Sequence, residues 1–272
     1  EKRFIDEKYH SLPNLGGAGK NAINVEEMLK MNPAFLIMME ELDEGSISKA
    51  EELEEQTGKP VIFLDSDLHR LDEAYNILGK ALGEEERAEE LAKYCKKAME
   101  DIEKKALKIK EEEKVRVYYA EGPNGLETEP SGSWHVEIID IVGGINVVEA
   151  VIKGDKGKSE VSIEQLLIWD PDIIISWDDE RGGYYSEIFK DPAWKDIKAV
   201  NNKEIYEIPN RPFNWFDRPP SVNRILGVKW VGNLLYPEVF GYNMRDEVKE
   251  FYQKFYHYQL SEEEIDDLLE NS

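Results

Sequence analysis

The side chains best suited to holding a small solute lie in a segment bounded by prolines. The segment RPFNWFDRPP starts at Arg211 and places Trp215, Phe216 and Arg218 on a backbone that proline stiffens and keeps out of a regular helix. Large rings beside a cation can cover an extended ligand and neutralise its negative charge. We therefore expect these four residues to line a ligand site. The alternative is that both rings fill the protein's own core while Arg218 pairs with Asp217.

Two further candidates follow a predicted strand at 115–120. Trp134 and His135 open a predicted helix at 133–142, which places them at the carboxyl end of that strand. This is the edge where open α/β sheets bind ligands. His135 could accept a metal or donate to an anionic chelate, but a lone histidine is also common as an ordinary polar contact. No second His or Cys stands at ligand spacing, which argues against a protein site for a bare transition metal.

A third group follows the predicted strand at 172–177. Trp177 ends that strand, and Arg181 and Tyr184 come next, on either side of a Gly-Gly pair. We expect all three to reach the same sheet edge as ligand contacts. The intervening acidic residues 178–180 are typical of a solvated turn, because their spacing does not suit a hard cation.

The glycine-rich stretch LGGAGKN, at residues 15–21, resembles a phosphate-binding loop only in part. The pattern requires glycine where Asn14 stands and Ser or Thr where Asn21 stands. Exposed backbone amides ahead of a helix can still hold an anion. We therefore expect Gly17 and Lys20 to contribute ligand contacts from the first half of the chain.

The chain contains an internal sequence repeat. INVEEMLKMNPAFLIM at 23–38 returns as VSIEQLLIWDPDIIIS at 161–176, with Glu26 and Glu164 at matching places. Each copy predicts an amphipathic helix, an Asn/Asp-Pro stop and a buried parallel strand. The repeat predicts two similar α/β lobes. A glutamate in a first helical turn is also explained by the helix dipole alone.

A long helical pattern separates the two copies. Residues 84–114 contain no Gly or Pro and keep their apolar residues near helical spacing. We predict one rigid helix spanning two lobes with Rossmann-like parallel sheets. The expected domains are an N-terminal lobe at 1–82, the spanning helix at 83–114, and a C-terminal lobe with C-terminal helices at 115–272.

The first lobe is shorter than the second. The second has a predicted strand and helix, 115–143, ahead of its repeat copy, whereas the first has only about twenty residues with no such pattern. A parallel lobe without its first βα unit would leave a strand edge unpaired. We therefore expect one such unit to be missing, disordered or replaced.

Two lobes with one connecting helix, the paired openings Asn24-Val25-Glu26 and Ser162-Ile163-Glu164, and the segment 211–238 together resemble the class III substrate-binding proteins of ABC importers. The resemblance covers nearly all of residues 12–260. It implies that the protein is not an enzyme, that it needs no cofactor, and that Glu26 and Glu164 dock into arginine pockets on the two permease subunits. It also implies a periplasmic or extracellular location and a monomer.

Within that family the expected ligand is a ferric siderophore or a similar anionic chelate, because basic side chains and rings are frequent among the candidates. A molybdate or tungstate oxyanion and a corrinoid remain open alternatives. An oxyanion would need a tight polar pocket, and a siderophore an open aromatic one. The rivals outside the family are an enzyme or metallocluster protein on twin Rossmann-like lobes, and a scaffold that binds only macromolecules. The single cysteine, Cys95, and scattered histidines disfavour the enzyme.

Composition sets the remaining bounds. The formal net charge of −24 disfavours nucleic acid as a partner. No apolar run is long enough for a membrane span, so we expect a membrane link only through a lipid anchor outside this sequence. No secretion signal is visible, and one is expected to have been removed or to lie outside this sequence.

Overall fold

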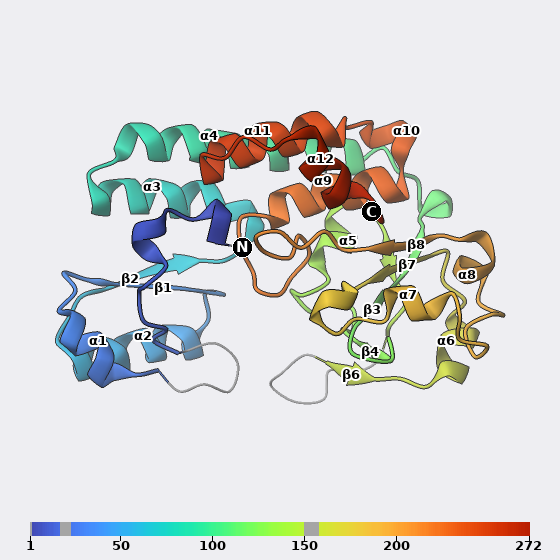
Figure 1. Cartoon of the computed structure of the whole chain (residues 1–272), viewed down its shortest axis with the longest axis horizontal. Helices are drawn as coiled ribbons and strands as arrows, with labels where there is room; N and C mark the ends of the chain where they lie inside the picture. The colour runs from blue at the N-terminus through green and yellow to red at the C-terminus, as the bar shows by residue number, and fades with distance from the viewer. Residues whose placement is uncertain (1, 17–22, 150–157) are drawn as a thin grey trace. The chain divides into compact units, whose positions relative to one another are not determined.

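The chain folds into two units that each combine helices with parallel strands. The computed structural model in Figure 1 describes residues 2–16, 23–149 and 158–272. Contacts divide the chain into an N-terminal unit, residues 2–99, and a C-terminal unit, residues 100–272. Within the described ranges, no helix has both the length and the apolar character needed to cross a bilayer.

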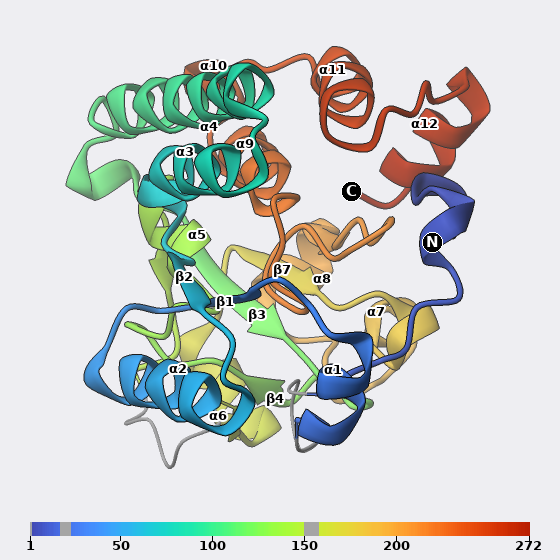
Figure 2. The same cartoon turned by 90° about the vertical axis from the view of Figure 1, so that its left-hand side faces the viewer.

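The N-terminal unit is built on two parallel strands. β1 (Leu36–Glu40) pairs with β2 (Val61–Asp65), with Leu36 opposite Val61. Figures 1 and 2 show α1 and α2 on one side of this pair and α3 on the other. The helices are η1 (Lys2–Phe4), η2 (Glu7–Tyr9), α1 (Val25–Met31), α2 (Glu44–Thr57), η3 (Leu68–Arg70), α3 (Leu71–Leu82) and the first part of α4 (Glu85–Ala106). Met28, Leu36 and Leu53 form a small core between helix and strand.

The C-terminal unit contains a four-stranded parallel sheet in the order β5-β3-β7-β8. Its strands are β3 (Arg116–Ala120), β5 (Ile145–Asn146), β7 (Ile173–Ser176) and β8 (Ile205–Glu207). A short antiparallel pair, β4 (Glu127–Thr128) with β6 (Ser159–Glu160), lies beyond the end of β3. The mixed α/β architecture with parallel strands confirms the predicted fold class.

Helices cover both faces of this sheet, so the central residues of β3 and β7 are apolar and buried. Tyr118 packs with Trp194 on one face, and the neighbouring Tyr119 packs with Phe216 on the other, 4.6 Å between ring centroids. The helices of the unit are η4 (Glu111–Glu113), α5 (Glu137–Ile141), α6 (Ile163–Trp169), η5 (Asp179–Arg181), α7 (Tyr185–Ile188), α8 (Lys198–Asn202), α9 (Arg224–Leu235), α10 (Pro237–Phe240), α11 (Met244–Tyr256) and α12 (Glu262–Leu269).

The internal repeat is visible in backbone detail. α1 and α6 are capped by Asn24 and Ser162, whose side chains accept a hydrogen bond from the backbone of the third helical residue. Both helices end at a residue in the left-handed conformation, Asn32 with φ 47° and Asp170 with φ 43°. Proline follows each, so neither helix can continue, and the chain turns into β1 or β7.

Several predicted helices are shorter than expected. The pattern at 84–114 forms a helix only over Glu85–Ala106. After the helix ends, the Ile109 side chain lies against Gly143, a residue that is distant in the sequence and that the local pattern does not reveal. The expected spanning helix through 114 is therefore wrong in its length. The segment after Tyr184 forms only the short α7, and turns separate α7 from α8, which begins at Lys198. The helix at 133–142 begins only at Glu137, so Trp134 and His135 lie in the turn before it.

Candidate ligand-binding site

A cluster of polar side chains lies where the strands of the C-terminal sheet end. β3 leads directly into Glu121, and β7 leads into Trp177. The loop before α9 brings Asp217 and Arg218 to the same place. Glu129 completes the cluster from the segment after β4. Because all four segments meet at the carboxyl edge of a parallel sheet, the cluster occupies the expected ligand-binding position of this fold.

Arg218 is held by three carboxylates. Its Nη1 donates to Glu121 Oε1 and to Asp217 Oδ2, both at 2.7 Å, and its Nη2 donates to Glu129 Oε1 at 2.5 Å. The three acidic side chains are 0% exposed, whereas 24% of the arginine side chain is exposed. Arg218 is therefore the partly exposed member of a buried ionic cluster, and the three carboxylates fix the orientation of its guanidinium.

Asp217 joins two of the predicted contacts to this cluster. Its Oδ1 accepts from the Tyr119 hydroxyl at 2.6 Å, and that hydroxyl in turn accepts from Trp177 Nε1 at 2.5 Å. Its Oδ2 lies 3.1 Å from His135 Nδ1. His135 therefore has one ring nitrogen committed to a carboxylate, and its side chain is 12% exposed. The structure thus brings together His135 and Trp177, which were predicted from the strands they follow, and Arg218, which was predicted from the proline-bounded loop.

Glu121 is the most strongly perturbed acid of the cluster. Burial, reinforced by the charge of Asp217, raises its pKa to about 8, although Arg218 and Lys158 act in the opposite direction. Its Oε2 is buried and has no hydrogen-bond partner among the described residues. The folded state therefore favours the protonated form of Glu121 more than an exposed glutamate would. The cations of the cluster are Arg218 and Lys158, and Lys158 is shared between Glu121 at 3.6 Å and Glu127 at 3.0 Å.

The rings expected to form a ligand wall are buried. Trp215 and Phe216 are 0% exposed, and Phe216 stacks on Tyr119 inside the unit. The backbone carbonyl of Trp215 packs directly against Gly227 of α9. The prediction that these two rings contact ligand is therefore wrong, because the stiff loop turns them inward. Trp134, by contrast, is 36% exposed and lies against the His135 ring, with 3.6 Å between centroids.

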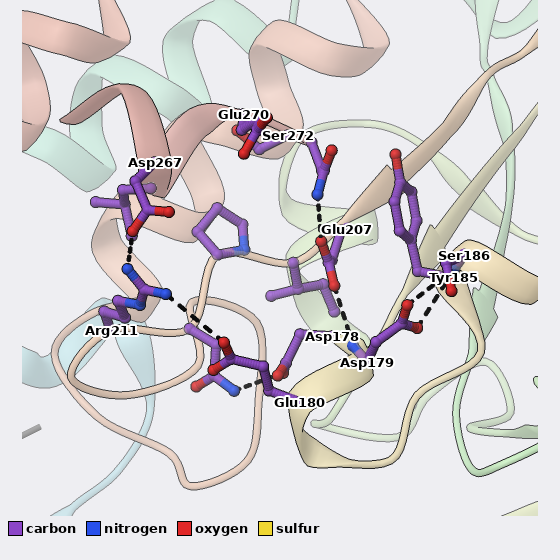
Figure 3. Close-up of a pocket in the computed structure, with 15 residues that line it drawn as sticks. Asp178, Asp179, Glu180, Tyr185, Ser186, Glu207, Arg211, Asp267, Glu270 and Ser272 are labelled. Atoms are coloured by element: carbon purple, nitrogen blue, oxygen red, sulfur yellow. Dashed lines mark hydrogen bonds and ion pairs between the residues drawn. The ribbon is translucent and has the colours of Figure 1, made fainter. Parts of the chain in front are cut away.

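Arg211 lines a different feature, a pocket of about 490 Å³ at the ends of β7 and β8 (Figure 3). It forms ion pairs with Asp267 and, at 3.8 Å, with Glu180. Figure 3 shows carboxylates on several sides of this pocket. The acidic residues that line it are Asp178, Asp179, Glu180, Glu207, Asp267 and Glu270. Arg211 is therefore paired with two of these acidic side chains, Asp267 and Glu180.

The other predicted contacts are less well placed. Tyr184 donates its hydroxyl to Asp191 at 3.0 Å and packs on the Trp194 ring, so it supports the core. Arg181 ends η5 with its backbone amide donating to Asp178. Gly17 and Lys20 lie outside the described residues. Glu121, Glu129 and Tyr119 were not predicted, although Glu121 directly follows a strand and Tyr119 is its penultimate residue, a position that could have signalled them.

Glu26 and Glu164 stand in equivalent first turns. Glu26 has 83% of its side chain exposed and forms an ion pair with Lys30 at 3.0 Å. Glu164 is exposed too, and a hydrogen bond from backbone at the start of α6 lowers the pKa of its carboxyl. Three residues after each glutamate comes an exposed leucine, Leu29 at 42% and Leu167 at 37%. Each unit thus presents one carboxylate beside one apolar side chain.

Comparison with known proteins agrees with this architecture. The family model for periplasmic binding proteins matches residues 6–212. The chain belongs to the periplasmic binding protein family. The solved structure of an ABC transporter solute binding protein from Sulfurospirillum deleyianum is 34% identical with a TM-score of 0.92, over 99% of this chain and 82% of that chain.

Two curated relatives are more distant. The molybdate-binding protein MolA of Haemophilus influenzae is 25% identical, over 87% of this chain and 70% of its own length. The Fe(3+)-citrate-binding protein YfmC of Bacillus subtilis is 28% identical, over 68% of this chain and 56% of its own length. As a member of this family, the protein is a substrate-binding component of an ABC importer and not an enzyme. It acts in the periplasm or on the outer face of the cell membrane, and carries a transported ligand in place of a cofactor.

Proposed function

We propose that this protein captures an iron complex, a ferric siderophore or similar anionic chelate, and delivers it to an ABC permease docked through Glu26 and Glu164. One observation carries the proposal: an arginine is presented at the carboxyl edge of the sheet, with exposed surface, on a rigid base of buried carboxylates. His135 and Trp134 lie beside it through Asp217. A cation, an imidazole and an open ring suit a chelate that bears both anionic oxygens and flat apolar surface.

Similarity to YfmC supports the same class of ligand, since that relative is named for ferric citrate. The internal repeat supports the proposed permease contacts, because each of two similar permease subunits would meet an equivalent carboxylate on one unit of this protein. An ABC permease is the partner of the family, so one glutamate for each of two subunits is an economical arrangement.

Molybdate is a second candidate, and two observations favour it. MolA matches most of this chain. The burial of Trp215 and Phe216 also removes the two largest rings from a proposed ligand wall, leaving a smaller and more polar site that suits a compact oxyanion. Ligand size therefore distinguishes the two candidates.

A thermal-shift screen of the ligand-free protein tests the proposal. The probes are ferric citrate, a ferric catecholate siderophore, haem, cobalamin and molybdate, with sulfate and iron-free citrate as controls. A ligand at one hundred times its Kd stabilises the folded state by about 2.7 kcal/mol, which corresponds to roughly 5 °C or more for a chain of this size. We expect such a shift with a ferric chelate. A shift in Tm with molybdate alone would identify the oxyanion and not an iron complex as the ligand. No shift with any probe would contradict both ligand proposals.

A further inference from the structure

Arg218 has two hydrogen-bond donors left over. A guanidinium carries five N–H groups. Two on Nη1 and one on Nη2 are used by Glu121, Asp217 and Glu129. Among the described residues no other partner of Arg218 exists, which leaves Nε–H and one Nη2–H. Nε and Nη2 form one edge of the guanidinium, the edge that binds a carboxylate in a two-pronged manner.

The carboxylates that hold Arg218 are themselves fixed. Glu129 accepts a second bond from the Ser133 hydroxyl at 3.0 Å. Asp217 accepts from the Tyr119 hydroxyl at 2.6 Å, and its backbone amide donates to Asn214 at 2.9 Å. All three acids are 0% exposed, so water does not compete for these bonds. The arginine therefore loses little further conformational freedom when a ligand binds.

We propose that Glu121, Glu129 and Asp217 are positioning residues that aim the two unused N–H groups of Arg218 at a pair of oxygen atoms on the ligand, which therefore bears a carboxylate or an oxoanion group. This inference rests on the proposed function and narrows its ligand class. Without the clamp, a partly exposed arginine would sample many rotamers, and each productive contact would cost conformational entropy.

The test compares binding of two kinds of probe. Ferric citrate and molybdate bear a net negative charge, whereas a ferric trihydroxamate complex is neutral, with all its hydroxamate oxygens bound to iron. For the wild-type protein we expect at least tenfold tighter binding of one anionic probe than of the uncharged complex. Arg218→Lys should weaken binding of that anionic probe by about 30-fold or more, because an ammonium cannot satisfy three carboxylates and still present a two-pronged edge.

Glu129→Gln isolates the positioning role. It keeps an oxygen acceptor at Nη2 but removes the charge, so we expect a loss of about three- to tenfold in affinity for the anionic probe and no loss for the uncharged complex, although Tm should fall because a buried ion pair is lost. Arg245→Lys is the matched control, since Arg245 is also held by two acids, Glu262 and Asp266, and should bind as wild type.

The outcomes separate the two proposals. If wild type binds none of the probes, the proposed function fails, and this inference fails with it. Binding of ferric citrate or molybdate that Arg218→Lys leaves unaltered would overturn the inference alone. A Glu129→Gln variant that matches wild type on every probe would overturn the positioning role. Should Arg218→Lys fail to fold, the wild-type preference decides: equal or tighter binding of the uncharged complex contradicts the inference.

Discussion

Glu121 shows at the level of one residue how the cluster couples charge to folding. It is fully buried, its second oxygen has no partner, and its pKa is raised from 4.5 to about 8. An acid with a raised pKa in the folded state binds its proton more tightly when folded. Its contribution to stability is therefore complete below pH 4.5 and is lost as the pH rises through about 8.

Glu121→Gln should remove this dependence. From pH 5 to pH 9 the free energy of unfolding of the wild type should decrease by about 1–3 kcal/mol more than that of the variant, because the variant's amide has no proton to lose. Urea unfolding at pH 5, 7 and 9 measures the difference. Glu238→Gln on the exposed side of α10 is the control and should run parallel to wild type. Parallel curves for Glu121→Gln as well would show that Glu121 is already ionised at pH 5.

Single residues also mark how far sequence reasoning reached. The positions of His135, Trp177 and Arg218 after strands and in the proline-bounded loop pointed to one edge of the sheet, and the structure brings them together through Asp217. The direction of Trp215 and Phe216 could not be read in the same way. Both rings face inward because α9 packs closely behind their loop, and that contact joins segments that no local pattern relates.

At the scale of elements, local signals determined what could be predicted. The two repeat helices have a capping residue, an apolar stripe and a proline stop in their own sequence, and both were placed within a residue or two. The end of α4 was not predictable because it depends on Ile109 meeting Gly143. The short α7 and α8 are a similar case, since Trp194 between them is drawn into the core against Tyr118.

The packing of α9 against the loop that carries Asp217 and Arg218 gives an element-scale prediction. A Cβ at Gly227 would lie 1.8 Å from the carbonyl oxygen of Trp215, so Gly227→Ala must push the helix or the loop aside. We expect a loss of about 2–3 kcal/mol in the free energy of unfolding, together with weaker binding of anionic ligand, because the displaced loop positions Arg218.

Chemical unfolding and a ligand titration on the same variant measure both effects. Gly45→Ala in α2 is the control: the nearest atom to its added Cβ is the Asp43 carboxylate oxygen that caps the helix, at 3.2 Å and not 1.8 Å, so stability should change by less than about 1 kcal/mol. Wild-type stability for Gly227→Ala would mean that α9 and its loop are not rigidly joined.

At the scale of the whole molecule, the internal repeat bears on how the protein docks to its permease more than on how it binds ligand. The two units differ in their parallel sheets, which have two described strands in the N-terminal unit and four in the C-terminal unit. The first turns of α1 and α6 are nevertheless alike in capping, in the exposed glutamate and in the exposed leucine. Folding alone does not require this likeness, because an exposed carboxylate adds little stability. The proposed docking to a partner made of two similar subunits would account for it.

Reversing both charges tests this reading. Glu26→Arg combined with Glu164→Arg should lower ligand-stimulated ATP hydrolysis by the reconstituted cognate permease at least tenfold, because two arginines would face the basic pockets expected on the permease. Each single reversal should have an intermediate effect. Ligand affinity should be unchanged, and Tm should shift little, since the Glu26–Lys30 pair is exposed. Glu51→Arg combined with Glu250→Arg, also exposed but outside the repeat, controls for the change in net charge. Full stimulation by the Glu26 and Glu164 double variant would exclude docking through these residues, and a loss of ligand affinity would place them in the ligand site instead.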